Sequence, residues 1–194
     1  MQIGVAPRPR NTRDMILHHA AACFAASGLS ATMGDIAAAA GVSRRTLYNH
    51  FPAREAVLEA LVERQSLDFL ADMRQALTMD GDFPVFLLDC CVHVIRESPK
   101  APMALLHVGN SAARAATALH FGSSAVIVAW VEFFQGPYVE GLRLGQLDPG
   151  IELADLLAWF GRVVTSYLQV PLTIDDDEIR RQIDRFFIAA IRAR

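Results

Sequence analysis

The sequence predicts an all-helical protein in which a small helix-turn-helix domain precedes a larger helical domain. Along most of the 194 residues, apolar side chains recur at helical spacing, and no stretch shows the sustained alternation of a strand. Near the N-terminus, a glycine separates the alanine-rich segment "MGDIAAAA" from the short polar run "GVSRRTLYNHF". Two helices joined by such a break are typical of a helix-turn-helix.

The first four helices have recognisable ends. The first is expected from about Thr12 to Ser27, just before a glycine. Thr32 is a good N-cap for the second helix, and Ser43 for a third helix of only two turns, Arg44 to His50. A fourth helix follows "FPAR", where proline can start but not continue a helix, and should extend from Arg54 to about Thr78.

The polar run has the composition of a helix that meets nucleic acid. Gly41 can take the positive φ of a tight turn, while Leu47 and Phe51 supply apolar anchors for the short helix. Arginine reads guanine edges, and hydroxyl, amide and imidazole groups reach phosphates and bases. We therefore interpret it as a recognition helix. Its outward residues are Arg44, Arg45, Thr46, Tyr48, Asn49 and His50.

The net charge of −3 is unevenly distributed. Residues 1–54 carry six arginines against two aspartates, a net charge of +4, so the other 140 residues carry −7. A basic N-terminal part on an acidic body suggests that only the first part meets a polyanion.

A dense set of residues in "GLSATMGDIAAAAGVSRRTLYNHFPAREAVLEAL" matches one known pattern. The matching residues are Gly28, Thr32, Ile36-Ala37, Ala40-Gly41-Val42-Ser43, Leu47-Tyr48, His50-Phe51, Arg54 and Leu58. With these residues, positions 12–60 resemble the DNA-binding domain of the TetR family of bacterial transcriptional regulators. The sequence departs from the family pattern at Arg54, where lysine is usual, and at Gly34, which weakens the second helix slightly.

The resemblance implies a role for each matching polar residue. The residues that would hold the DNA backbone are Thr32, Ser43, Tyr48, His50 and Arg54. Those that would face bases are Arg44, Arg45, Thr46 and Asn49. For any one of them, the alternative is a solvated polar residue on a small domain.

Residues 55–194 are expected to form a helical domain that binds an effector and dimerises. Its last two helices carry wide apolar stripes, and few other elements remain to cover them. Burial within one subunit is the alternative, but an interface of two helices from each subunit would also account for the 53% of hydrophobic residues. The TetR resemblance implies the same homodimer, which suits a near-palindromic operator in double-stranded DNA. The expected interface residues are Leu156, Phe160, Val164, Ile183, Phe187 and Ile191.

Aromatic and isolated polar residues gather in the middle of the chain. Such a mixture suits a pocket for a small molecule, although bulky aromatic residues on helices are more often plain core. The candidate pocket residues are Phe86, His93, His107, Asn110, Trp130, Phe133, Phe134 and Trp159. Pro137 should kink or break its helix there, which can open a cavity or merely end a turn.

Other classes of protein fit the sequence poorly. "GNSAA" at 109–113 half-resembles a nucleophile elbow but lacks the second glycine and a preceding strand. The three cysteines have no partners at zinc spacing and are expected to be small, reduced core residues. We therefore expect no enzyme, catalytic residue, metal or cofactor. Neither a membrane-spanning run nor a secretory signal is found, which makes a cytoplasmic protein the default.

The sequence thus predicts a flexible basic arm at 1–11, a helix-turn-helix DNA-binding domain at 12–54 and an effector-binding and dimerisation domain at 55–194. The expected function is that of a homodimeric repressor, released from its operator by a small, hydrophobic or aromatic effector. A regulator without an effector, or an activator, is the alternative.

Overall fold

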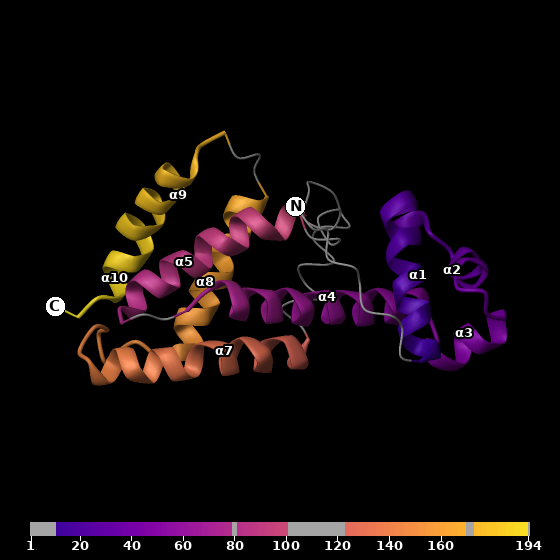
Figure 1. The fold of residues 1–194 in the computed structure, drawn as a ribbon, viewed down its shortest axis with the longest axis horizontal. Helices are drawn as coiled ribbons and strands as arrows, with labels where there is room; N and C mark the ends of the chain where they lie inside the picture. The colour runs from indigo at the N-terminus through magenta and orange to yellow at the C-terminus, as the bar shows by residue number, and fades with distance from the viewer. Residues whose placement is uncertain (1–10, 79–80, 101–122, 170–172, 194) are drawn as a thin grey trace. The chain divides into compact units, whose positions relative to one another are not determined.

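The computed structural model describes residues 11–78, 81–100, 123–169 and 173–193 (Figure 1). Every regular element in these ranges is a helix, apart from an isolated antiparallel bridge between Leu147 and Arg192, and the predicted all-helical class is confirmed. The chain divides into two compact units, Met1–Val62 and Glu63–Arg194. Among the described helices, none combines the length and the apolar character needed to cross a bilayer.

The N-terminal unit is built on α1 (Thr12–Ser27), α2 (Met33–Ala39) and α3 (Arg44–His50), with the first part of α4 (Arg54–Ala76). A 3-10 turn, Gly28–Ser30, follows α1. Gly28 ends α1 with a φ of 56° and donates its N–H to the carbonyl of Phe24. The inner faces of the helices form one core, with these residues at most 7% exposed: Ile16, Leu17, Ala20, Phe24, Ile36, Ala37, Leu47, Phe51, Val57 and Leu58.

The turn between α2 and α3 depends on the conformation of one residue. Gly41 has a φ of +64°, and a Cβ added there would meet open space, so the backbone angle and not crowding favours glycine. Its N–H donates to the carbonyl of Ala38 (3.2 Å), and the N–H of Val42 donates to that of Ala37 (3.0 Å). The predicted role of Gly41 is confirmed.

Both predicted N-caps are present. The hydroxyl of Thr32 accepts a hydrogen bond from the N–H of Asp35 (3.2 Å), and the Asp35 carboxylate accepts one from the N–H of Thr32 (2.9 Å). Together these bonds form a capping box. The hydroxyl of Ser43 likewise accepts the N–H of Thr46 (3.0 Å) at the start of α3.

The C-terminal unit is organised around α5 (Phe83–Glu97), which contacts α7, α8 and α9; Figure 1 shows α8 crossing behind it. The remaining elements are the 3-10 turn Ser98–Lys100, α7 (Ser124–Arg143), α8 (Leu153–Leu168), α9 (Asp176–Ile183), a π-helical turn (Asp184–Ile188) and α10 (Ala189–Ile191). An aromatic cluster fills the core between α5, α7 and α8: Phe86, Trp130, Phe133, Phe134 and Phe160.

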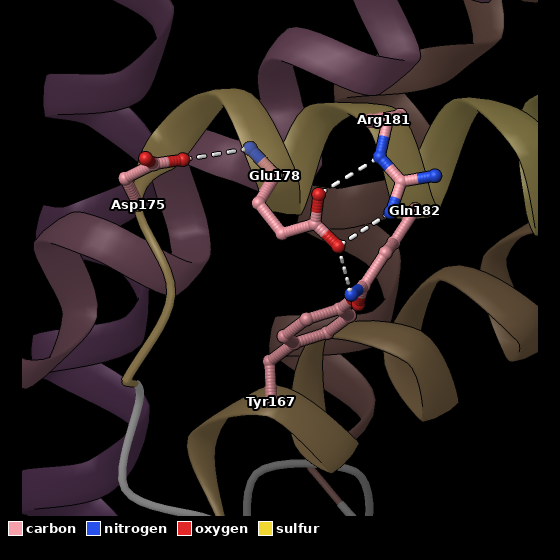
Figure 2. A network of polar contacts seen from close by, with 5 residues as sticks. All are labelled: Tyr167, Asp175, Glu178, Arg181 and Gln182. Carbon is pink, nitrogen blue, oxygen red and sulfur yellow. Dashed lines mark hydrogen bonds and ion pairs between the residues drawn. The ribbon is translucent and has the colours of Figure 1, made fainter.

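Polar contacts fasten α9 to the rest of this unit (Figure 2). The hydroxyl of Tyr167 on α8 donates to the side-chain oxygen of Gln182 (2.9 Å), whose amide nitrogen donates to Glu178 (2.7 Å). Glu178 also accepts two hydrogen bonds from Arg181 (2.8 and 2.6 Å). These donors lower the pKa of Glu178 to about 2, so its carboxylate is charged at neutral pH. Two ion pairs, Arg180 with Asp89 and Arg96 with Asp176, connect α9 to α5.

α7 continues through Pro137 and is not broken there. Proline has no N–H to donate to the preceding turn, so helix packing on both sides must compensate for the missing bond. Phe133 and Phe134, before the proline, and Gly141, after it, are all buried.

The close approach of α7 to α5 at Gly141 predicts the outcome of a pair of glycine substitutions. A Cβ at Gly141 would lie 2.8 Å from the Cβ of Phe83, an atom that cannot move without α5. We expect Gly141→Ala to lower the free energy of unfolding by about 1–3 kcal/mol in urea denaturation. Gly136→Ala is the control in the same helix, where an added Cβ meets nothing within 4 Å and alanine should stabilise the helix by up to about 1 kcal/mol. Equal effects of both substitutions would contradict this close packing.

Candidate functional site

The outward face of α3 presents the polar residues that the sequence analysis selected. Leu47 is fully buried and Phe51 is 2% exposed, so the opposite side of α3 packs into the core of the N-terminal unit. The guanidinium carbon of Arg13 lies 5.1 Å from the centre of the Phe51 ring, a cation–π contact that covers the end of the helix. The exposed side chains are Arg44, Arg45, Tyr48, Asn49 and His50, while Thr46 is half-buried.

Three of the predicted hydroxyl contacts are already used inside the domain. The hydroxyls of Ser43 and Thr46 are hydrogen-bonded to each other (2.8 Å). The Thr32 hydroxyl donates to the Asp35 carboxylate (2.7 Å). Thr32 and Ser43 therefore act as helix caps within the domain. Both residues are also exposed, and a hydroxyl oxygen that already takes part in one hydrogen bond can accept another from outside the domain.

The arginines of this surface lie beside two carboxylates. The guanidinium of Arg54 pairs with Glu55 at 3.1 Å, and that of Arg44 approaches Gly34 on α2, next to Asp35. Hydrogen bonds from the Thr32 hydroxyl and N–H lower the pKa of Asp35, with a smaller contribution from the charge of Arg44. The pKa of Glu55 is lowered by a backbone N–H and by Arg54. Arg45 and His50 are also exposed on this surface, and neither belongs to the Arg54–Glu55 pair or to the contact between Arg44 and α2.

A pocket of about 730 Å³ lies in the C-terminal unit, lined by α4, α5, α7 and α8. This volume is in the range that holds a small organic molecule. Its wall is mainly apolar and includes Phe69, Val94, Trp130, Val131, Leu157 and Phe160. Among the described lining residues, Arg162 is the single charged one, and its guanidinium stacks on the neighbouring Trp159 at 5.6 Å. The site is therefore suited to an uncharged or largely apolar ligand.

Two serines line the pocket although they are buried. Ser66 is 6% exposed and Ser98 is 8% exposed. Within the part of the chain that the structure describes, the hydroxyl oxygen of Ser98 has no hydrogen-bond partner. A buried polar group without a partner costs about 1–3 kcal/mol, so a ligand that reaches Ser98 could recover this free energy.

The structure places the predicted pocket residues in different surroundings. Trp130 lines the pocket, whereas the Phe86, Phe133 and Phe134 side chains are packed in the aromatic core. His93 lies against the ring of Phe69, with the ring centres 5.8 Å apart. Trp159 is 59% exposed and is not part of the wall. Two further candidates, His107 and Asn110, lie outside the described residues, as do Ser111 and residues 1–10 of the predicted arm.

The six residues expected between two subunits are buried within a single chain. Each is 2–7% exposed and belongs to the core of the C-terminal unit: Leu156, Phe160, Val164, Ile183, Phe187 and Ile191. The apolar stripe of α8 is thus covered by α5 and α7, and that of α9 and the turn after it by α5. Trp159 on α8 and Phe186 on the π-helical turn after α9 (76%) are exposed instead.

Most of the pocket wall was not predicted from the sequence. Several of the residues not predicted are small or polar, such as Ser66, Ser98, Gly161 and Thr165, and lie on otherwise apolar helices. Their one signal is that they interrupt an apolar face, which a helix pattern alone does not distinguish from a tolerated polar residue. No group of three histidine, cysteine or acidic side chains that could hold a metal is found among the described residues.

Comparison with known proteins places the N-terminal unit among transcriptional regulators. Residues 16–61 match the model of "Bacterial regulatory proteins, tetR family". The uncharacterised HTH-type transcriptional regulator YvaF of Bacillus subtilis is 46% identical over 48 residues, which are 25% of this chain and 23% of YvaF. The HTH-type transcriptional repressor KstR2 of Mycolicibacterium smegmatis is 42% identical over 79 residues, 40% of this chain and 38% of KstR2. Both alignments therefore span well under half of these relatives.

The whole chain is similar in fold to solved structures. FadR of Bacillus subtilis, solved in complex with stearoyl-CoA, superposes with a TM-score of 0.61 over 91% of this chain and 98% of FadR, at 17% sequence identity. At that identity the likeness concerns the fold, and it extends the match from the helix-turn-helix to the C-terminal unit.

Proposed function

We propose that this chain, a member of the TetR family of bacterial regulatory proteins, is a homodimeric, DNA-binding repressor that a small apolar molecule releases from its operator. The observation that carries the proposal is the α2–Gly41–α3 unit, which buries Leu47 and Phe51 and leaves the polar face of α3 exposed. The family is one of non-enzymatic regulators. The site of action would be the cytoplasm, where operator DNA lies.

In this proposal α3 enters the major groove and its residues divide the work. Arg45 and Asn49 are exposed on successive turns of α3, and their side chains match guanine and adenine edges respectively. Tyr48, half exposed, and His50 carry groups that suit phosphate oxygens, as does Arg54 at the start of α4. Thr32 and Ser43 contribute by holding the two helix ends in place and by offering their exposed hydroxyls to the backbone.

The division between bases and phosphates predicts two kinds of variant. Arg45→Ala should relax the preference at one base position by about 1–3 kcal/mol, because a guanidinium–guanine contact is lost. Tyr48→Phe should weaken binding to all sequences alike, because a phosphate contact carries no base information. Selection from random operators, followed by titration of the selected sites, measures both effects. An unchanged base preference for Arg45→Ala would contradict the assignment, and the absence of any selected sequence for the wild-type protein would contradict DNA recognition itself.

The second copy of the chain would dock on the outer faces of α8 and the C-terminal helical segment. Trp159 and Phe186 are the exposed aromatic residues there, each with an arginine stacked on its ring. Charges of both signs surround them: exposed Asp155 and Arg162 on α8, and exposed Asp184 and Arg185 next to Phe186. A surface that carries both signs around apolar residues can be complementary to itself across a two-fold axis.

This interface predicts how the subunits respond to a new charge. Phe186→Asp should separate the dimer, because burying an unpartnered carboxylate between subunits is costly while the monomer keeps it in water. Val139→Asp is the matched control, since Val139 is 56% exposed on α7, a helix that is not part of the proposed interface. Light scattering with multi-angle detection should give a monomer for the first variant and a dimer for the second. A Phe186→Asp protein that remains dimeric would remove this surface from the interface.

The effector would occupy the pocket between α4, α5, α7 and α8. Its largely apolar wall favours a hydrophobic or aromatic molecule. The Ser98 hydroxyl, which has no hydrogen-bond partner among the described residues, favours a molecule that also carries a hydrogen-bonding group. Relatives of similar fold are linked to such chemistry: FadR of Bacillus subtilis was solved with stearoyl-CoA, and KstR2 of Mycobacterium tuberculosis is named a ketosteroid transcriptional regulator. The alternatives that the sequence left open, a regulator without an effector and an activator, differ from this proposal in measurable ways.

A screen of apolar metabolites by thermal shift would test the pocket. A true effector should raise the melting temperature, and Ser98→Ala should weaken its binding by about tenfold, the loss of one buried hydrogen bond. The effector should weaken operator binding by the same factor by which the operator weakens effector binding, because the coupling between two sites is reciprocal. A molecule that binds in the pocket yet leaves operator affinity unchanged would contradict the release mechanism.

A further inference from the structure

Gly34 gives the side chain of Arg44 a place on α2. A Cβ built at Gly34 would lie 3.0 Å from a terminal nitrogen of the Arg44 guanidinium and 3.6 Å from its central carbon. The hydroxyl oxygen of Thr32 lies 3.5 Å from the same position. The end of Arg44 therefore lies against the bare backbone of α2, although the residue itself begins α3.

The carboxylate of Asp35, next to Gly34, helps to hold the guanidinium of Arg44 beside α2. Next to Gly34 is Asp35, whose carboxylate is fixed by two hydrogen bonds from Thr32 (2.9 and 2.7 Å). Arg44 is close enough to this carboxylate to contribute to its lowered pKa, so the attraction between the charges acts on the side chain from one side. Both arginine and carboxylate remain exposed, which leaves the remaining donors of the guanidinium open to another anion.

We propose that the contact with Gly34 makes Arg44 a phosphate-binding residue and takes it away from the bases, so that Arg45 and Asn49 alone read the sequence from the first turns of α3. In a helix-turn-helix the first helix crosses the DNA backbone, while the second lies in the groove. A guanidinium that lies on α2 is therefore on the side of the backbone. Gly34 acts as a positioning residue in this arrangement, since a Cβ there would crowd the guanidinium at 3.0 Å and a larger side chain would take its place. The inference rests on the proposed DNA-binding function.

Four variants of the full-length protein test it: Arg44→Ala, Gly34→Ala, Gly34→Leu and the double variant Gly34→Leu/Arg44→Ala. Each is titrated against the operator selected by the wild-type protein and against random DNA, at several salt concentrations. Arg44→Ala should weaken binding to every sequence by about tenfold and reduce the salt slope by about 0.9, the signature of one lost phosphate contact. The preferred sequence should not change. Gly34→Leu should reproduce both effects, with Gly34→Ala between it and the wild type.

The double variant shows whether Gly34 affects DNA binding by positioning Arg44 or independently of Arg44. If Gly34 acts through Arg44, then Gly34→Leu should cost nothing further once Arg44 is alanine. Gly136→Ala on α7 is the control for a glycine whose replacement meets open space, and it should bind like the wild type. Thermal denaturation accompanies each titration, because a lower melting temperature would attribute the loss to unfolding of α2.

The outcomes are distinct. A changed base preference for Arg44→Ala, or wild-type affinity for Gly34→Leu, would overturn the inference while leaving DNA binding intact. Independent, additive losses from the two substitutions would overturn the positioning role of Gly34. If the wild-type protein selects no DNA sequence, the proposed function fails instead.

Discussion

The recognition surface depends on the burial of two side chains, Leu47 and Phe51. A helix of seven residues such as α3 is too short to be stable alone in water, so its geometry must come from contacts with the rest of the domain. Leu47 is fully buried in the core of the N-terminal unit, and Phe51, at the end of the helix, is held under the guanidinium of Arg13. The sharp turn at Gly41 fixes the direction in which α3 leaves α2. Because these constraints act on the inner side, the outer residues are free to vary in chemistry without loss of the fold.

The C-terminal unit has one continuous core, but this core does not fill all the space between its helices and leaves a pocket. α5 is buried on most sides and is covered by α7, α8 and α9. Aromatic packing closes one region, from Phe86 to Phe160, while smaller residues such as Gly161 leave space in another. The polar network of Tyr167, Glu178 and Gln182 and the ion pairs of α9 with α5 hold this frame from outside. These hydrogen bonds and ion pairs at the surface of the unit thus hold the helices apart, so that the pocket between them stays open.

Much of the N-terminal unit was predictable from sequence, and less of the C-terminal unit. Caps and turn residues act locally, so Thr32, Gly41 and Ser43 could be assigned from their neighbours in the chain, and the structure confirms all three. A broad apolar stripe shows that a face is buried but not what buries it, and Phe160 and Phe187, predicted to meet a second chain, are covered within their own. For the pocket, the large aromatic residues suggested a wall, yet Phe133 and Phe134 fill the core and the space lies beside small residues. A cavity is set by the volumes of neighbours that are distant in sequence, which a single helix pattern does not report.

The three cysteines have a practical consequence for chemical work on this protein. Burial raises the pKa of the Cys90 and Cys91 thiols, and burial together with the charge of Asp35 raises that of Cys23. The thiolate is the reactive form, so the fully buried Cys90 and Cys91 should resist mild oxidants and maleimides, whereas Cys23 is only partly buried and stays accessible to them. A single cysteine introduced on an exposed position of α3 would therefore carry a fluorophore or spin label selectively once Cys23 is replaced, while Cys90 and Cys91 can stay.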